Sequence, residues 1–223
     1  MTLSLSRLVT PFAVIGQGLL AVYVLLWGRA GPIPMHFGLD GTVDRYGDRT
    51  EAALLIAGMA ALSLVVGLMI DASARMPEAN DARRRGLAFA KALGVGVPCM
   101  ISAVMAVLAL SEHPEQLMSG HAVTTAFCGL FAVVGAVMGK VPPNAFVGVR
   151  TYWSLNSRLA WDRSNRLAGR LFLGFGLFGM VGSLALPLKL AMPILVVGVL
   201  VIAGLSVFES WRVWRSDPER RVV

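Results

Sequence analysis

Six long apolar runs divide this chain, and the gaps between them alternate between rich and poor in Lys and Arg. Each run has about 18 to 24 residues, and a helix that rises about 1.5 Å per residue needs that length to cross a hydrocarbon layer of about 30 Å. The pattern predicts an all-α, polytopic membrane protein with six transmembrane helices in a compact bundle, a single membrane domain over residues 1–223. The runs cover residues 8–28, 52–70, 87–110, 122–139, 171–188 and 190–208.

The basic residues predict the orientation. Sixteen of the 20 Lys and Arg residues lie before the first run, at the second and fourth gaps, or after the last run. The other gaps hold only Arg29, Arg45, Arg49 and Lys189. Short cytoplasmic loops are enriched in Lys and Arg. We therefore expect the N- and C-termini and residues 140–170 to be cytoplasmic, and residues 29–51 to lie outside.

The composition agrees with a membrane protein. Hydrophobic residues make up 56% of the chain and its mean hydropathy is +0.69, which leaves too little polar surface for a soluble globule of this length. The net charge of +7 is explained by a cytoplasmic face attracted to anionic lipid, so no direct nucleic-acid partner is expected. Cys99 and Cys128 both lie within apolar runs and indicate no disulfide framework.

Ionisable side chains are missing from the middle of the runs. No Asp, Glu, His or Arg lies at mid-depth, and Lys91, near the cytoplasmic end of the third run, is expected to extend its amine to the interface. Proton-coupled carriers and intramembrane hydrolases place ionisable groups at mid-depth, so we predict a chain that is not an enzyme and holds no cofactor. Gly135 and Gly139 form a GxxxG pattern in the fourth run, which predicts close helix packing.

The outer loop, residues 29–51, combines prolines, glycines and acidic residues. Its glycines, at 38, 41 and 47, are expected to break any regular element and to leave an ordered turn structure. His36 and three Asp residues recur every four positions, a spacing that on a helix would gather metal ligands. Three interpretations stay open: solvated carboxylates on an ordered loop, a ligand-recognition surface, and a metal site with weak candidates at His36, Asp44, His113 and His121.

The inner loop, residues 140–170, combines basic and aromatic residues. Arg158, Asp162 and Arg166 are four residues apart, and on a helix they would form charge pairs along one face. An interfacial anchor is favoured, although Arg166 would then fall beside leucines, which leaves the anchor an incomplete explanation. Amphipathic aromatics of the kind found at headgroup level stand at Tyr152, Trp153 and Trp161.

Both loops resemble signatures of known membrane families. The outer loop looks like the opening P-x-H-x-x-x-x-G-x-x-D-x-x-G pattern of a membrane domain of unknown function, matched by Pro34, His36, Gly41, Asp44 and Gly47. The inner loop is similar to the signature of the SdpI family of bacterial immunity proteins. That signature is carried here by Gly139, Lys140, Pro143, Asn144, Gly148, Arg150, Thr151, Trp153, Leu155, Trp161, Arg166, Leu167 and Gly169.

The resemblance implies a multi-pass protein of the bacterial cytoplasmic (inner) membrane that protects its host from a secreted killing peptide, in some members with signalling through a cytoplasmic repressor. Its partners would be the lipid bilayer, a toxin peptide outside and a repressor inside. The chain departs from the family pattern at Tyr152, where proline is usual, at Arg158 and Leu159, where acidic residues are common, and at Asn165, which replaces a frequent histidine. We therefore expect the fold to carry over better than the mechanism.

Three functions compete. The favoured one is a non-enzymatic immunity or signalling protein whose outer loop meets a peptide and whose inner loop binds a cytoplasmic partner. The second is a small-molecule permease built on a 3+3 helix repeat, suggested by the long, proline-led first gap of each half and opposed by the lack of charge at mid-depth. The third is a metal-dependent enzyme that uses the outer histidines and Asp44.

Overall fold

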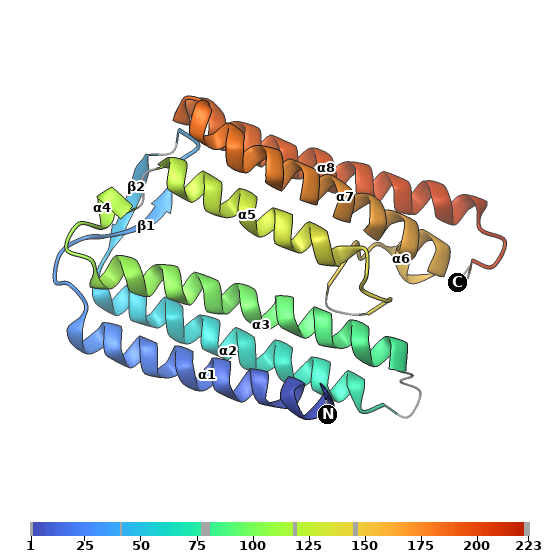
Figure 1. Ribbon diagram of the computed structural model, residues 1–223, viewed down its shortest axis with the longest axis horizontal. Coiled ribbons are helices and arrows are strands. Elements are labelled where there is room, and N and C mark those ends of the chain that lie inside the picture. Colours follow the sequence, from blue (N-terminus) through green and yellow to red (C-terminus); the bar gives the residue numbers. More distant parts are fainter. Residues whose placement is uncertain (1, 41, 77–80, 118–119, 145–146, 221–223) are drawn as a thin grey trace. The chain divides into compact units, whose positions relative to one another are not determined.

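The computed structural model describes residues 2–40, 42–76, 81–117, 120–144 and 147–220, and within them six helices are long and apolar enough to cross a membrane (Figure 1). The predicted polytopic helical fold is confirmed, and the cytoplasmic placement of the termini stays a prediction. The long helices are α1 (Thr2–Trp27), α2 (Arg49–Ala74), α3 (Asp81–Leu110), α5 (Gly120–Met138), α7 (Arg158–Ala185) and α8 (Leu188–Ser216). The short elements described between them are β1 (Ile33–Phe37), β2 (Val43–Gly47), α4 (Pro114–Leu117) and α6 (Tyr152–Leu155).

The chain divides into two compact units, Met1–Gly120 and His121–Val223. The first holds α1 to α4 with both strands, and the second holds nearly all of α5 together with α6, α7 and α8. Each unit therefore has three of the six described spans, and the 3+3 helix repeat stays a prediction. That the two units form one membrane domain stays a prediction.

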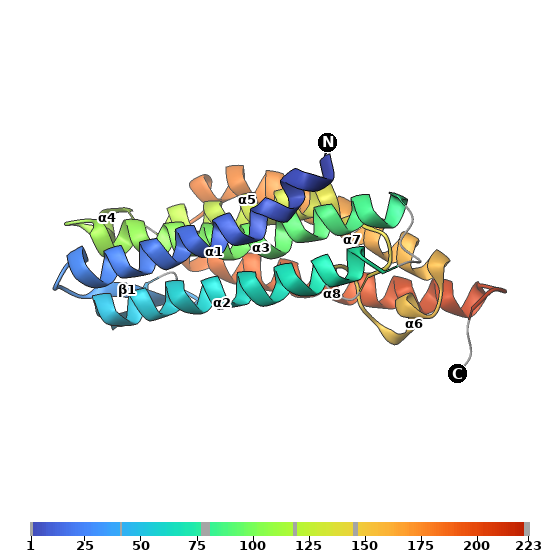
Figure 2. The ribbon, with the colours of Figure 1, turned by 90° about the horizontal axis from the view of Figure 1, so that it is seen from below.

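In the first unit α1, α2 and α3 run side by side in both views (Figures 1 and 2). Their shared core contains Val24, Ile56 and Leu108, one large aliphatic side chain from each helix, all at most 2% exposed. Outside such contacts the spans stay apolar: no described span has more than 39% of its most apolar window buried inside the protein. Exposed apolar surface over a span's length is what a helix facing lipid requires.

The outer loop forms an antiparallel hairpin, with Ile33 opposite Gly47 and Phe37 opposite Val43. Burial fixes the hairpin on the helices, because Ile33 is fully buried in the core of α1, α2 and α3. The ordered loop that we predicted is present, but the expectation that its glycines break every regular element is wrong. Gly38 follows β1 and Gly47 is the last residue of β2, so neither interrupts a strand.

An ion pair joins α2 to α3. The Lys91 amine lies 2.9 Å from both carboxylate oxygens of Asp71, and the lysine side chain is only 3% exposed. The expectation that this lysine extends to the interface is wrong. Asp71 directly follows the second apolar run and gives the amine a charged partner inside the unit, which compensates for the loss of hydration.

In the second unit α5 and α7 approach each other through glycines. A Cβ atom added at Gly135 would lie 2.7 Å from the Gly169 carbonyl oxygen, and one added at Gly176 would lie 2.5 Å from the Cys128 carbonyl oxygen. These distances leave no room for a side chain, so the close packing predicted from the GxxxG pattern is confirmed at Gly135. α7 also packs along α8.

Helix α7 begins at Arg158, well before the fifth apolar run at residue 171. Ser157 caps it, because its hydroxyl oxygen accepts a hydrogen bond from the Ala160 N–H at 2.9 Å. The second half of the inner loop is therefore helical. These helical residues extend the fifth span toward the N-terminus of α7. Several of them are basic, so hydropathy alone does not assign them to the helix.

Candidate functional site

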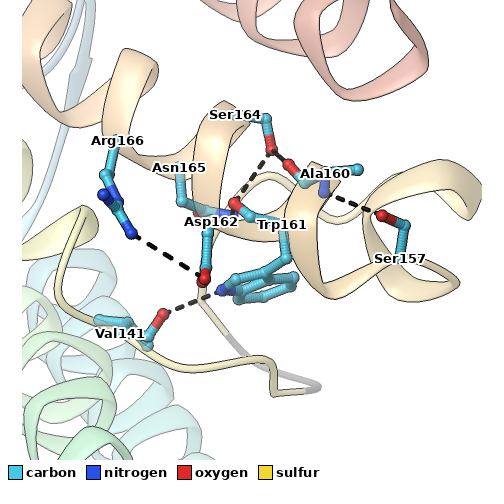
Figure 3. A network of polar contacts seen from close by, with 8 residues as sticks. All are labelled: Val141, Ser157, Ala160, Trp161, Asp162, Ser164, Asn165 and Arg166. Carbon is cyan, nitrogen blue, oxygen red and sulfur yellow. Dashed lines mark hydrogen bonds and ion pairs between the residues drawn. The ribbon is translucent and has the colours of Figure 1, made fainter. Parts of the chain in front are cut away.

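Trp161 anchors the segment before α7 to that helix. Its indole Nε1–H donates a hydrogen bond to the Val141 carbonyl at 2.9 Å, and the side chain is fully buried (Figure 3). The expectation that Trp161 sits at headgroup level is wrong, because the residues that precede α7 fold back over its ring. We call the described part of residues 140–157 the docked segment.

Asn165 makes the second attachment, one helical turn further along α7. Its Oδ1 accepts a hydrogen bond from the Val149 N–H at 2.8 Å. Its Nδ2 donates to the Trp161 carbonyl at 2.9 Å (Figure 3). The residue is 1% exposed. Gly148 lies against both side chains with a φ of 128°, and a Cβ there would lie 2.6 Å from Asn165 Oδ1. Only glycine adopts this conformation readily in so little space.

Side chains within the docked segment fix its turns. Asn144 accepts a hydrogen bond from the Val147 N–H at 2.8 Å and donates to the Pro142 carbonyl at 2.8 Å. Thr151 caps α6 in a capping box with Ser154, whose hydroxyl also donates to the Val149 carbonyl. Hydrogen bonds between its own side chains and backbone groups thus hold the described part of the segment.

The docked segment also contacts the end of α8. The Thr151 and Ser210 hydroxyl oxygens are 2.7 Å apart, and the Ser157 hydroxyl donates to the Asp217 carboxylate. Ser157 and Asp217 are both buried, so this hydrogen bond is shielded from water. Further along, the Arg220 guanidinium stacks over the Trp214 ring at 4.8 Å from its centroid. These contacts tie α6, α7 and α8 into one platform.

Basic side chains cover the outside of the platform. Of the predicted ladder, Arg166 and Asp162 form a loose pair at 4.0 Å, with the arginine side chain 60% exposed. Arg150 is exposed, and its guanidinium has no hydrogen-bond partner among the described residues. Trp153 is half-buried and lines an apolar groove with Phe208 and Trp211. The other exposed basic residues of the docked segment and α7 are Lys140, Arg158, Arg163 and Arg170, and Arg212 and Arg215 are exposed on α8.

On the hairpin, His36 and Asp44 form a pair. His36 Nδ1 lies 2.7 Å from Asp44 Oδ1, and the two side chains are 66% and 48% exposed. Pro34 is buried in β1, and Gly47 at the end of β2 packs so closely that a Cβ there would lie 2.8 Å from the Met35 side chain. The structure thus brings His36 and Asp44 into contact and places Pro34 and Gly47 on the same hairpin, while Gly41 lies outside the described residues.

The other carboxylates of the outer loop have local roles. Asp40 accepts hydrogen bonds from the Thr42 N–H at 3.0 Å and from its hydroxyl at 2.8 Å, and these hold the pKa of Asp40 below its ordinary value. Asp48 caps α2 by accepting from the Glu51 N–H at 2.8 Å. Glu51 pairs with Arg45. Asp40 and Asp48, two of the residues at this four-residue spacing, therefore stabilise a turn and a helix N-terminus.

The weak metal candidates have other partners. No three His, Cys, Asp or Glu side chains come together as a metal cage within the described part of the chain. His36 contacts Asp44, while His121 Nδ1 lies 2.6 Å from the Ser183 carbonyl oxygen and can donate to it. This geometry gives no support to the metal-dependent enzyme.

Several residues that build these sites carried no signal in the sequence interpretation. Asn165 replaces a histidine that is frequent in the family pattern, and its amide can both accept and donate, as the buried Val149 N–H and Trp161 carbonyl require. No local pattern marks Ser154, and Asp217 lies well beyond the end of the last apolar run at residue 208.

Comparison with known proteins bears on the second unit. Residues 140–210 match the model of the SdpI/YfhL protein family, so the suspected resemblance is confirmed over that segment. The matched segment contains the docked segment, all of α7 and most of α8, which are the elements that build the platform. It covers less than half of the chain. No curated protein and no solved structure gave a match to this chain.

Proposed function

We propose that this protein is a non-enzymatic immunity protein of the bacterial cytoplasmic membrane that protects its host from a secreted antibacterial peptide. The observation that carries the proposal is the SdpI/YfhL match over residues 140–210 in a chain with six described spans. The match supports a membrane immunity function in broad terms. The choice of a peptide ligand, and of the surface that meets it, is our own inference.

The hairpin is the proposed recognition surface. It presents a carboxylate and imidazole pair together with two large exposed side chains, Leu39 at 63% and Tyr46 at 54% exposure. Mixed aromatic, apolar and polar groups on a rigid support are typical of protein interfaces. The support is rigid because Ile33 is buried in the core of the first unit. A two-stranded hairpin also leaves strand edges to which an extended peptide can add.

The platform is the proposed cytoplasmic surface. Its shape is set by the hydrogen bonds of Trp161, Asn165 and Thr151, and its exposed arginines present positive charge to an acidic surface. We propose that a cytoplasmic repressor docks there in the signalling members of the family, and that this chain retains the same surface. A rigid basic patch favours a protein partner of opposite charge, because complementary charges raise the rate of encounter.

A protection assay tests the proposal. A sensitive host expresses the parent, a His36→Ala/Asp44→Ala variant or a Glu112→Ala/Lys189→Ala control, and is challenged with secreted antibacterial peptides encoded near the gene. All four side chains are exposed, so the variants should keep their membrane abundance. We expect the parent and the control to raise the inhibitory concentration and the hairpin variant to lose that effect. No protection by the parent would contradict the proposal and would favour ligand-dependent flux as the next measurement.

A further inference from the structure

A groove of about 240 Å³ lies between α5 and α7, at the ends of these helices that face the docked segment. The groove is lined by three glycines, Gly135, Gly139 and Gly169, which bring the two backbones together and leave no side chains between them. Ala136 and Leu173 complete its apolar side. The groove is open at the surface of the second unit.

Three cations line this groove, Lys140 from the end of α5 and Arg166 and Arg170 from α7, and none of the lining residues is acidic. All three side chains are exposed. Arg166 has a loose ion pair with Asp162, at 4.0 Å. Neither the Lys140 amine nor the Arg170 guanidinium has a hydrogen-bond or ion-pair partner in the part of the chain that the structure describes.

This arrangement is unfavourable without an anion. Arg166 and Arg170 are four residues apart on one helix, and like charges at that spacing destabilise a helix by a few tenths of a kcal/mol. Lys140 adds a third positive charge at the same groove. A phosphate group would relieve the repulsion by accepting hydrogen bonds from all three side chains, and guanidinium groups match its oxygens in a two-point geometry.

We propose that this groove binds the phosphate of an anionic phospholipid. The three basic side chains hold the headgroup, and the apolar side formed by Ala136 and Leu173 leads the acyl chains along α5 and α7. Basic pockets between membrane helices on the cytoplasmic side are suited to anionic headgroups. The bound lipid would clamp α5 to α7 next to the docked segment, so the lipid composition of the membrane would tune the stability of the platform.

Lipid binding by the full-length protein in neutral detergent tests the proposal. Native mass spectrometry gives apparent dissociation constants for phosphatidylglycerol and phosphatidylcholine. The groove variant Lys140→Gln/Arg166→Gln/Arg170→Gln is compared with Arg150→Gln/Arg158→Gln/Arg163→Gln, which removes the same charge from exposed positions that do not line the groove. Ala136→Leu is a third variant, which fills the groove and keeps all three charges.

We expect the parent to bind phosphatidylglycerol at least about tenfold more tightly than phosphatidylcholine. The groove variant and Ala136→Leu should lose that preference, while the control keeps it. An equal loss in the groove variant and the control would overturn the proposal, because it would indicate general surface charge. Inorganic phosphate at millimolar concentration should not displace the lipid, and displacement without any lipid preference would instead assign the groove to free phosphate.

Discussion

Asn165 accepts a hydrogen bond at 2.8 Å from the backbone N–H of Val149, sixteen residues earlier in the chain. This bond and the Trp161 contact with Val141 attach the docked segment to α7 at two successive turns. The order of the segment therefore depends on two side chains of the helix that follows it. The first predictions concern this attachment.

Asn165→Ala should lower the free energy of unfolding by about 1 to 3 kcal/mol, because it leaves the buried Val149 N–H without an acceptor. The same change should make the docked segment more susceptible to proteolysis in detergent. Asn156→Ala is the matched control, since its amide bonds only the Tyr152 carbonyl in an exposed turn. Equal melting temperatures and digestion patterns for the two variants would contradict the proposed attachment.

Gly148→Ala should destabilise the protein by about 1 to 3 kcal/mol, because alanine rarely adopts a positive φ and its Cβ would press on Asn165. Gly174→Ala is the control, because a Cβ at Gly174 meets nothing within 4 Å. That control should be neutral or slightly stabilising, since alanine favours a helix interior. Thermal unfolding in one detergent compares the two. A Gly148→Ala protein as stable as the control would show that the close approach is not formed.

The buried pair of Lys91 and Asp71 should show strong coupling. Lys91→Met alone is expected to cost about 3 kcal/mol, because it leaves the Asp71 carboxylate, whose side chain is 20% exposed, without its partner. Lys91→Met combined with Asp71→Leu should cost about 1 kcal/mol or less. A double-mutant cycle of unfolding free energies measures the coupling. Additive single effects would contradict the ion pair.

The spans and the helical fold could be predicted from the sequence because hydropathy over about 20 residues reports directly on the bilayer. The hairpin could not, since its two strands have five residues each and only Ile33 and Pro34 of their residues are buried. Hydropathy also could not predict where α7 begins, because the first turns of the helix are basic. The start of the helix depends on the Ser157 cap.

The candidate site was predicted as residue types but not as geometry. The sequence predicts the inner signature residues as residue types, whereas the burial of Trp161 depends on a backbone that returns over α7, which no local pattern encodes. Lys91 was misplaced for the same reason. Its partner Asp71 lies twenty residues away on another helix, so their contact is visible only once α2 and α3 pack.

Cysteine labelling should test the orientation. In a background with Cys99→Ala and Cys128→Ala, Thr42→Cys should react with an impermeant maleimide in intact cells, whereas Leu155→Cys should react only after lysis. Both positions are exposed, unlike Ser157, which is buried as the cap of α7. The reverse labelling pattern would place the hairpin in the cytoplasm and the platform outside.

The central claim is that the hairpin meets the toxin peptide, and photocrosslinking tests it most directly. A photoreactive phenylalanine analogue replaces Tyr46, which is 54% exposed on β2, or Leu155, which is 52% exposed on α6. Cells that express either protein are treated with a peptide against which the parent protects, and then irradiated. We predict a crosslinked peptide from position 46 and none from position 155. A crosslink from position 155 alone, in cells that both proteins still protect, would contradict recognition by the hairpin.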